Sequence, residues 1–395
     1  VGPHLVGFGI DVKPILARGV HVASVARKYD ERGNLIEEAY FDADGSPTLR
    51  QDVGAARIAL KYDEHGNLIE ESYSGSDGAP ISLESSGVAR TVLKYDERGN
   101  RVEHAYFGVD GQPIVRHDVG AAQMTWNYDE RGNEVEQAYF GPDGKPTLST
   151  EAGVARMSWR YDDRGNLLEE SYFGVDDRPI ASRTSGVARM AWKYDQRGNL
   201  VELTFFDAEG LPALDNDTGI ARGAMEYDER GNVIERSYFG PDGKPILRTD
   251  RGDARTVLEY DERGNTIAET YNAVDGAPVL RTDLGVARAA WKYDERGNQV
   301  EAAWFGVSGE PVLRKDIGVA RMVRKFDDRN RIAEETYLDT VGRPINRSDW
   351  PTARVSWTYD ARTGDVVSIA YDASGAAISR ACADWSGRAI ACIAN

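Results

Sequence analysis

Tyr-Asp-Glu-Arg-Gly-Asn, at residues 29–34, is the stretch of this sequence that decides the fold, because it returns every 33 residues along the chain. Its eleven copies begin at Tyr29, Tyr62, Tyr95, Tyr128, Tyr161, Tyr194, Tyr227, Tyr260, Tyr293, Phe326 and Tyr359. A strict period of this length indicates an array of equivalent small units, each burying its apolar side against its neighbours. Ankyrin repeats share the period, but no copy here offers two helix-length runs with 3.6-residue periodicity.

Each copy has the pattern of two strands joined by a turn. In one copy, the apolar residues Met157, Trp159 and Tyr161 alternate with polar residues before the turn, and Leu168 and Tyr172 alternate in the same way after it. A period of two predicts half-buried strands. Glycine and proline interrupt the pattern too often for helices of ordinary length. The sequence therefore predicts a tandem array of β-hairpins.

The glycine of the motif, Gly33 in the first copy, predicts a left-handed residue in the turn, and Asn330 replaces it in one copy. Asparagine is the residue that tolerates this geometry next best after glycine. A three-residue loop would place Lys28 opposite Ile36 and mix apolar with polar residues on each face. A four-residue loop, residues 30–33, keeps one face apolar. Because burial sets register, we expect the four-residue loop.

A second turn, Gly-x-Asp-Gly-x-Pro as at residues 141–146, leads into an apolar pair such as Ile246 and Leu247. We expect this pair to plug the edge of the apolar layer. The last copy departs from the pattern, since its turn at residues 361–365 carries one extra residue and Ala377 replaces the proline. With that insertion, Tyr371 is expected to fill the aromatic position that Tyr172 fills in its own copy.

The end of the chain is expected to be a cap. Terminal units of an array have to cover an apolar edge and unpaired strand groups. The two cysteines, Cys382 and Cys392, are the only ones in the chain. They are either small buried thiols or a disulfide that fixes the terminal unit. Three apolar residues of the tail could supply the cover: Trp385, Ile390 and Ile393.

Composition and length narrow the function classes. The 395 residues carry a formal net charge of −17, which disfavours nucleic acid and anionic membrane surfaces as partners. No run of 18 apolar residues predicts a membrane insertion. Residues 7–30 align without gaps on residues 238–261, so the chain opens inside a degenerate repeat. We expect a part-repeat over residues 1–28, a continuous array over residues 29–380, and a cap over residues 381–395.

The copies also resemble a known family. Tyr-Asp-Glu-His-Gly-Asn-Leu-Ile at residues 62–69 is similar to the signature of YD-repeat (RHS-type) proteins, and the Asp-Gly-x-Pro half is similar to MORN-like hairpin repeats. The resemblance implies bacterial β-hairpin arrays on cell surfaces or in secreted toxins, some closing into shells around cargo. The regular 33-residue period favours an open spiral. The expected fold class is all-β, with the hairpins forming a superhelical antiparallel sheet or a β-solenoid-like array.

No catalytic group repeats with the period, so we expect no enzyme, no cofactor and no metal site. Three ladders of equivalent residues remain as candidates: arginines and tryptophans of the first strand, and glutamates of the second. The charged ladders either pair between adjacent strands or form a ligand-binding stripe. The tryptophans either pack between hairpins or stack on sugars. The candidate ligand-binding residues are Trp126, Trp159, Trp192, Trp291, Arg156, Arg189, Glu169 and Glu202.

The expected function is therefore a non-enzymatic repeat scaffold that binds a protein or carbohydrate ligand. The resemblance implies that it belongs to a larger exported bacterial protein, at the cell surface or outside the cell. The alternative is an inert structural spacer or shell segment of a toxin-like protein. Exposed residues that vary between copies would indicate binding, and their absence would indicate a spacer.

Overall fold

The computed structural model describes residues 10–14, 22–384, 386–390 and 392. Over these residues the chain is all-β, with strands and turns and no helix. Its internal contacts divide it into two units, Val1–Ala191 with Phe206–Leu211 and Trp192–Phe205 with Pro212–Asn395. The predicted array of tandem 33-residue hairpins is confirmed in both.

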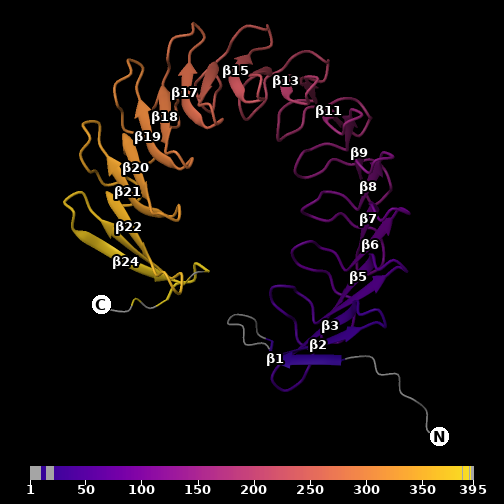
Figure 1. Cartoon of the computed structure of the whole chain (residues 1–395). Helices are drawn as coiled ribbons and strands as arrows, with labels where there is room; N and C mark the ends of the chain where they lie inside the picture. Colours follow the sequence, from indigo (N-terminus) through magenta and orange to yellow (C-terminus); the bar gives the residue numbers. More distant parts are fainter. Residues whose placement is uncertain (1–9, 15–21, 385, 391, 393–395) are drawn as a thin grey trace. The chain divides into compact units, whose positions relative to one another are not determined.

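Within each unit, each strand pairs antiparallel with the next one in the sequence, and Figure 1 shows the strands in this order. The first unit holds β1 (Ile10–Pro14), β2 (Ser24–Tyr29), β3 (Leu35–Phe41), β4 (Arg57–Tyr62), β5 (Leu68–Ser74), β6 (Arg90–Tyr95), β7 (Arg101–Phe107), β8 (Gln123–Tyr128), β9 (Glu134–Phe140), β10 (Arg156–Tyr161) and β11 (Leu167–Phe173). The boundary runs through β12 (Arg189–Tyr194) and β13 (Leu200–Phe206). The second unit continues with β14 (Arg222–Tyr227), β15 (Val233–Phe239), β16 (Arg255–Tyr260), β17 (Thr266–Asn272), β18 (Arg288–Tyr293), β19 (Gln299–Phe305), β20 (Arg321–Phe326), β21 (Ile332–Leu338), β22 (Arg354–Tyr359), β23 (Val366–Tyr371) and β24 (Ala377–Ala383).

The hairpin loop holds three residues, so the prediction of four is wrong. In the hairpin β10–β11, the Asp162 amide donates to the Asn166 carbonyl oxygen at 2.9 Å, which leaves only residues 163–165 in the loop. Gly165 lies at φ 84° in this loop, as the motif predicts. A three-residue loop alone would turn the apolar residues of the second strand to the polar face.

A bulge in the second strand restores the apolar face. Tyr161 pairs with Leu167, but the next pair joins Arg160 to Glu169, so Leu168 is the extra residue of a β-bulge. A bulge shifts the alternation of a strand by one residue, which cancels the shift that the short loop introduces. The faces are therefore those that the sequence predicts, although the register differs by two residues.

The turn glycine should be required where it stands. Replacing Gly165 with valine should destabilise the protein by more than about 1 kcal/mol, because a β-branched residue resists positive φ. A Cβ at Gly165 would meet no atom within 4 Å, so the loss would arise from the backbone alone. Urea unfolding would measure it. Gly165→Asn is the matched control, since Asn330 already holds φ 61° in its own copy, and equal losses in both variants would contradict the argument.

The aspartate of the motif organises the turn. Asp294 Oδ1 accepts hydrogen bonds from the amides of Arg296 and Asn298, both at 2.9 Å, while Oδ2 accepts one from the Asn298 side chain at 2.9 Å. The hydrogen bond from that side chain and those from the backbone hold the pKa of the Asp294 carboxyl below its ordinary value. Asp and Asn thus recur together because one satisfies the other.

The remaining motif residues join neighbouring repeats. The Tyr293 hydroxyl donates to the Thr266 carbonyl oxygen of the preceding repeat at 3.1 Å. The Arg296 guanidinium donates to the Asp328 carbonyl oxygen of the following repeat at 3.1 Å. Tyrosine therefore reaches back along the array and arginine reaches forward. Within the motif, Asp, Gly and Asn therefore shape the turn, while Tyr and Arg connect it to the neighbouring repeats.

The apolar core lies between one face of the sheet and the chain that follows the second turn. In the second unit it is formed by Tyr271, Val286, Ala289, Ala302, Trp304, Val319 and Tyr337. Val279 and Val312, the first residues of their apolar pairs, pack against it. The second residues, Leu280 and Leu313, are exposed. The expected plug is thus confirmed only for the first residue of each pair.

Proline limits the third segment of an ordinary repeat. Pro311 forms a single bridge with Phe305, after which the chain leaves the sheet. Proline cannot donate a hydrogen bond to a strand ladder, which explains this short contact. In the last copy Ala377 takes its place, and the segment extends into the full strand β24 beside β23. This strand covers the last hairpin.

The register of the last copy corrects one expectation. The longer turn at residues 361–364 is followed by a strand without the usual bulge, because Tyr359 pairs with Val366 and Thr358 with Val367. The extra turn residue replaces the bulge residue. Tyr371 therefore pairs with Arg354, in the place that Phe173 holds opposite Arg156, and the buried Ala370 holds the core aromatic position. The expectation that Tyr371 fills that position is wrong.

The two cysteines form a disulfide, Cys382–Cys392, which ties the tail to β24. The Ile390 amide donates to the Cys382 carbonyl oxygen at 2.9 Å, so the tail also pairs with this strand. Trp385 and Ile393, the other residues expected to cover the edge, lie outside the described residues. At the other end, Ile10–Pro14 forms β1 beside β2, where its alignment with residues 241–245 would place a turn.

Candidate functional site

The charged ladders pair with each other on the face opposite the core. Glu202 forms an ion pair with Lys193 of its own hairpin at 2.6 Å and a second one with Arg222 of the following hairpin at 3.2 Å. The Arg222 guanidinium also lies 3.8 Å from the ring centroid of Phe239. Burial alone would raise the pKa of Glu202, but the hydrogen bond from Lys193 and the two cations lower it.

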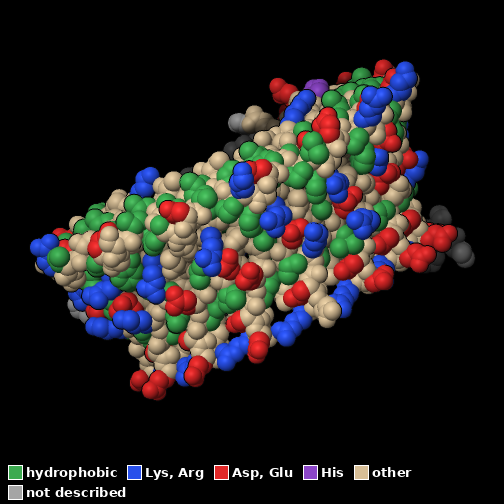
Figure 2. Space-filling view, turned by 90° about the horizontal axis from the view of Figure 1, so that it is seen from above, with side chains coloured by type: hydrophobic (Ala, Val, Ile, Leu, Met, Phe, Trp, Pro, Cys, Tyr) green, Lys and Arg blue, Asp and Glu red, His purple; other side chains and the backbone are tan. Residues whose placement is uncertain are grey.

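The other candidate charges follow the same scheme. Arg189 contacts Glu169 at 3.0 Å, and Arg156 contacts Glu136 at 3.3 Å. Each of these pairs joins adjacent strands, and exposed pairs of this kind contribute about 0.2–1 kcal/mol. Figure 2 shows acidic and basic side chains interspersed over the visible face rather than separated into patches. The geometry favours pairing over a ligand stripe, and ligand binding by these residues stays a prediction.

The tryptophan row borders the core. Trp126 is only 5% exposed and lies beneath the Arg101 guanidinium, 4.2 Å from it. Trp159 and Trp192 are half-buried, and Trp291 packs against the core cluster of the second unit. Trp291 also lines an open groove between two hairpin turns, with Ile267. A buried ring such as Trp126 cannot stack on a sugar, so only the half-buried members keep that prediction.

Buried tyrosine hydroxyls in the core have a built-in partner. The Tyr40 hydroxyl donates to Glu38 at 2.5 Å, and burial together with this hydrogen bond raises the pKa of Tyr40 to about 12. The Tyr271 hydroxyl donates to Glu269 in the same way, at 2.9 Å. In both cases the partner stands two residues earlier, on the same face of the strand. Tyr238 is an exception, because it follows Arg236 and its buried hydroxyl has no hydrogen-bond partner among the described residues.

The sequence carries a signal for this pairing, which lies outside the three ladders of arginine, tryptophan and glutamate. Where the aromatic residue has no hydroxyl, as at Phe205 and Trp304, the residue two positions earlier is Leu203 and Ala302, respectively. A buried hydroxyl without a partner costs about 1–3 kcal/mol, so the two positions are expected to change together. Burial and these hydrogen bonds are the physical cause of the raised tyrosine pKa values.

A row of exposed apolar side chains is the feature that sequence reasoning placed wrongly. It consists of the second residue of the apolar pair in successive repeats. In the second unit these residues are Leu214, Leu247, Leu280 and Leu313, between 41% and 44% exposed, and in the first unit they are Leu49, Val115 and Leu148. Periodicity could not separate them from their buried neighbours, because both positions are aliphatic in most copies.

The described residues offer little to other kinds of site. They contain no group of three or more His, Cys, Asp or Glu residues placed to hold a metal ion. Among them, no helix is long and apolar enough to cross a membrane.

No protein-family model and no curated protein matches the chain. Among solved structures, the chain matches TcdB2-TccC3 at 12% identity and a TM-score of 0.22, covering 92% of this chain and 25% of that one. The Photorhabdus luminescens Tc holotoxin pore matches at 12% identity and a TM-score of 0.20, covering 92% and 24%. A eukaryotic initiation factor matches at 8% identity and 0.19, covering 91% and 94%. The chain thus spans about a quarter of the length of the first two, and scores this low establish no shared arrangement.

Proposed function

We propose that this chain is a non-enzymatic repeat scaffold that binds a protein partner through the leucine row, which is the set Leu214, Leu247, Leu280 and Leu313 of the second unit. The observation that carries the proposal is their regular exposure. Two strands per repeat at about 4.8 Å each place successive members roughly 10 Å apart. Contiguous exposed apolar patches mark interaction surfaces more often than single exposed residues do.

The side chains favour protein over carbohydrate. Sugars stack on exposed aromatic rings, whereas the row is aliphatic and the tryptophans are half-buried or buried. The resemblance to YD-repeat proteins supports a place within a larger exported bacterial protein, at the cell surface or outside the cell. The alternative, an inert spacer or shell segment of a toxin-like protein, is favoured by the Tyr, Asp, Arg and Asn residues of the motif, which bond within the array.

A photo-crosslinking residue placed at Leu280 distinguishes the two functions. In the native cells, a binding scaffold should give one discrete protein adduct, and Leu247→Ser with Leu313→Ser should reduce its yield at least tenfold without shifting the melting temperature. The matched control places the crosslinker at Glu262, an exposed turn residue outside the row. No adduct from Leu280, or equal adducts from both sites, would favour the spacer.

A further inference from the structure

The arginine ladder has one member without a counter-charge. The side chain of Arg321, in β20, has no ion pair or hydrogen bond among the described residues, although the side chains of its neighbours along the ladder do. Glu301, the counterpart of Glu202, pairs with Lys292 at 3.1 Å but forms no ion pair with Arg321. Leu338 stands opposite Arg321, where most copies carry the phenylalanine on which the arginine lies.

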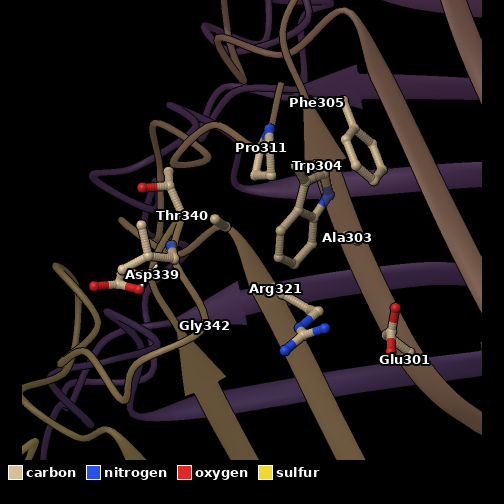
Figure 3. Close-up of a pocket in the computed structure, with 11 residues that line it drawn as sticks. Glu301, Ala303, Trp304, Phe305, Pro311, Arg321, Asp339, Thr340 and Gly342 are labelled. Atoms are coloured by element: carbon tan, nitrogen blue, oxygen red, sulfur yellow. Dashed lines mark hydrogen bonds between the residues drawn. The ribbon is translucent and has the colours of Figure 1, made fainter. Parts of the chain in front are cut away.

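A pocket opens at this break. Its volume is about 300 Å³, and its lining includes Trp304, Phe305 and Pro311 on one side and the turn at residues 339–342 on the other. Figure 3 shows Arg321 between that turn and Glu301, below Trp304 and Pro311, with no hydrogen bond joining Arg321 to the other residues drawn. The pocket therefore combines a half-buried guanidinium with an apolar wall.

The first unit shows what occupies the equivalent place when a carboxylate is present. Asp177 stands 165 residues before Gly342, as Arg156 stands before Arg321, and each interval is five periods. Asp177 replaces the turn glycine at φ 62°, and its Oδ1 accepts a hydrogen bond from Arg156 Nε at 2.9 Å. The repeat geometry thus brings a carboxylate at this turn position within reach of the ladder arginine.

In the second unit the equivalent turn residue is Gly342, which has no side chain to reach Arg321. A Cβ at Gly342 would lie 3.6 Å from Arg321 Nη2, so a carboxylate entering beside this glycine can reach the guanidinium. The other lining carboxylate on this turn, Asp339, is already held by Arg343 at 2.9 Å. With Glu301 held by Lys292, the pocket keeps one positive charge that nothing in its lining neutralises.

We propose that this pocket binds a small carboxylate whose body is aromatic or aliphatic. Arg321 would receive the carboxylate through paired N–H donors, the arrangement that guanidinium and carboxylate groups favour. The apolar body would lie against Trp304, Phe305 and Pro311. Either a free organic acid or the carboxyl end of a peptide offers this chemistry. The site is independent of the leucine row, so either proposal can fail without the other.

The test measures binding of 4-fluorophenylacetate to the full chain by fluorine NMR, with 4-fluorophenylacetamide as the neutral probe. The acid should bind, and the amide should bind at least tenfold more weakly. Arg321→Ala should weaken binding of the acid at least tenfold. Gly342→Asp should also weaken binding at least tenfold, because the new carboxylate would occupy the place that Asp177 holds beside Arg156. Arg222→Ala, which removes a fully paired ladder arginine, should leave binding unchanged.

A further variant guards against loss of structure. Leu338→Phe restores the ladder residue, should draw Arg321 onto the new ring, and should weaken the acid while preserving the melting temperature. Comparing the binding of acetyl-Ala-Phe with that of 4-fluorophenylacetate separates a peptide end from a free acid, since only a peptide site prefers the dipeptide acid to the fluorinated probe. Equal binding of acid and amide, or unchanged binding in Arg321→Ala and Gly342→Asp, would overturn the proposal.

Discussion

Removing residues 260–292, one complete period of the second unit, should leave a folded protein, whereas removing residues 260–275 should prevent that unit from folding. The complete deletion keeps each contact type. Tyr293 would take over the hydrogen bond of Tyr260 to the Val233 carbonyl oxygen, now 2.8 Å. Arg230 would reach Glu295 as it now reaches Glu262, at 2.5 Å. Stability in such arrays is close to a sum of repeat and neighbour terms.

The half-length deletion breaks these relations. It joins β16 directly to Gly276, so β16 loses its hairpin partner β17, and β18 loses the strand before it. Circular dichroism and urea unfolding would compare the two deletions. The complete deletion should retain a cooperative transition with a smaller m-value, in proportion to the surface removed. Similar damage from both deletions would argue that the number of repeats is fixed by the structure.

Acid should unfold the array in a narrow range below pH 4. Nine turn aspartates share the same cause of a lowered pKa, which is first of all the hydrogen bond from the asparagine four residues later: Asp30, Asp63, Asp96, Asp129, Asp162, Asp195, Asp228, Asp261 and Asp294. An aspartate in the unfolded chain has a pKa of about 3.9. Since the folded pKa is lower, the stabilisation is complete above the unfolded value and is lost as the pH falls through the folded value.

Because the same aspartate repeats in nine turns, the losses of stability add up over the array. Stability should therefore fall more steeply with pH than in a protein with one such aspartate. Urea midpoints measured between pH 7 and pH 2 would show it. Asp261→Asn should flatten the profile slightly, since it removes one titrating group from the turn. Glu262→Gln is the control, because the Glu262 side chain is exposed and bonds to no described residue. A midpoint that stays constant down to pH 2 would contradict the prediction.

Local features of the sequence were enough to predict the strands and turns. The alternation around Trp159 and the glycine at position 165 each depend on a few neighbouring residues, and both are as expected. The register was not predictable in this way. The loop is one residue shorter than burial alone suggests, and Leu168 is an apolar residue that looks like an ordinary member of its strand while acting as a bulge.

The sequence predicted which residue types form the candidate site, but not which groups they contact. Sequence periodicity identified the arginine and glutamate ladders, but whether they face a ligand or each other depends on distances such as the 3.2 Å between Arg222 and Glu202. Leu280 and Val279 could not be told apart, because both are aliphatic and adjacent. The break at Arg321 depends on Leu338, which pairs with it from the neighbouring strand, and in the sequence a leucine there looks like any other apolar strand residue.

The longer turn of the last hairpin has a consequence for comparing such chains by sequence. Its extra residue is offset by the missing bulge, so the total length of the repeat stays at its usual value and Tyr371 keeps the structural position of Phe173, where an ungapped alignment places it. An alignment that opens a single gap at the turn would therefore misplace every residue of the strand that follows. Insertions in this turn should be matched with deletions in the next strand, and lineages that carry one without the other should show repeats whose inward and outward residues have exchanged places.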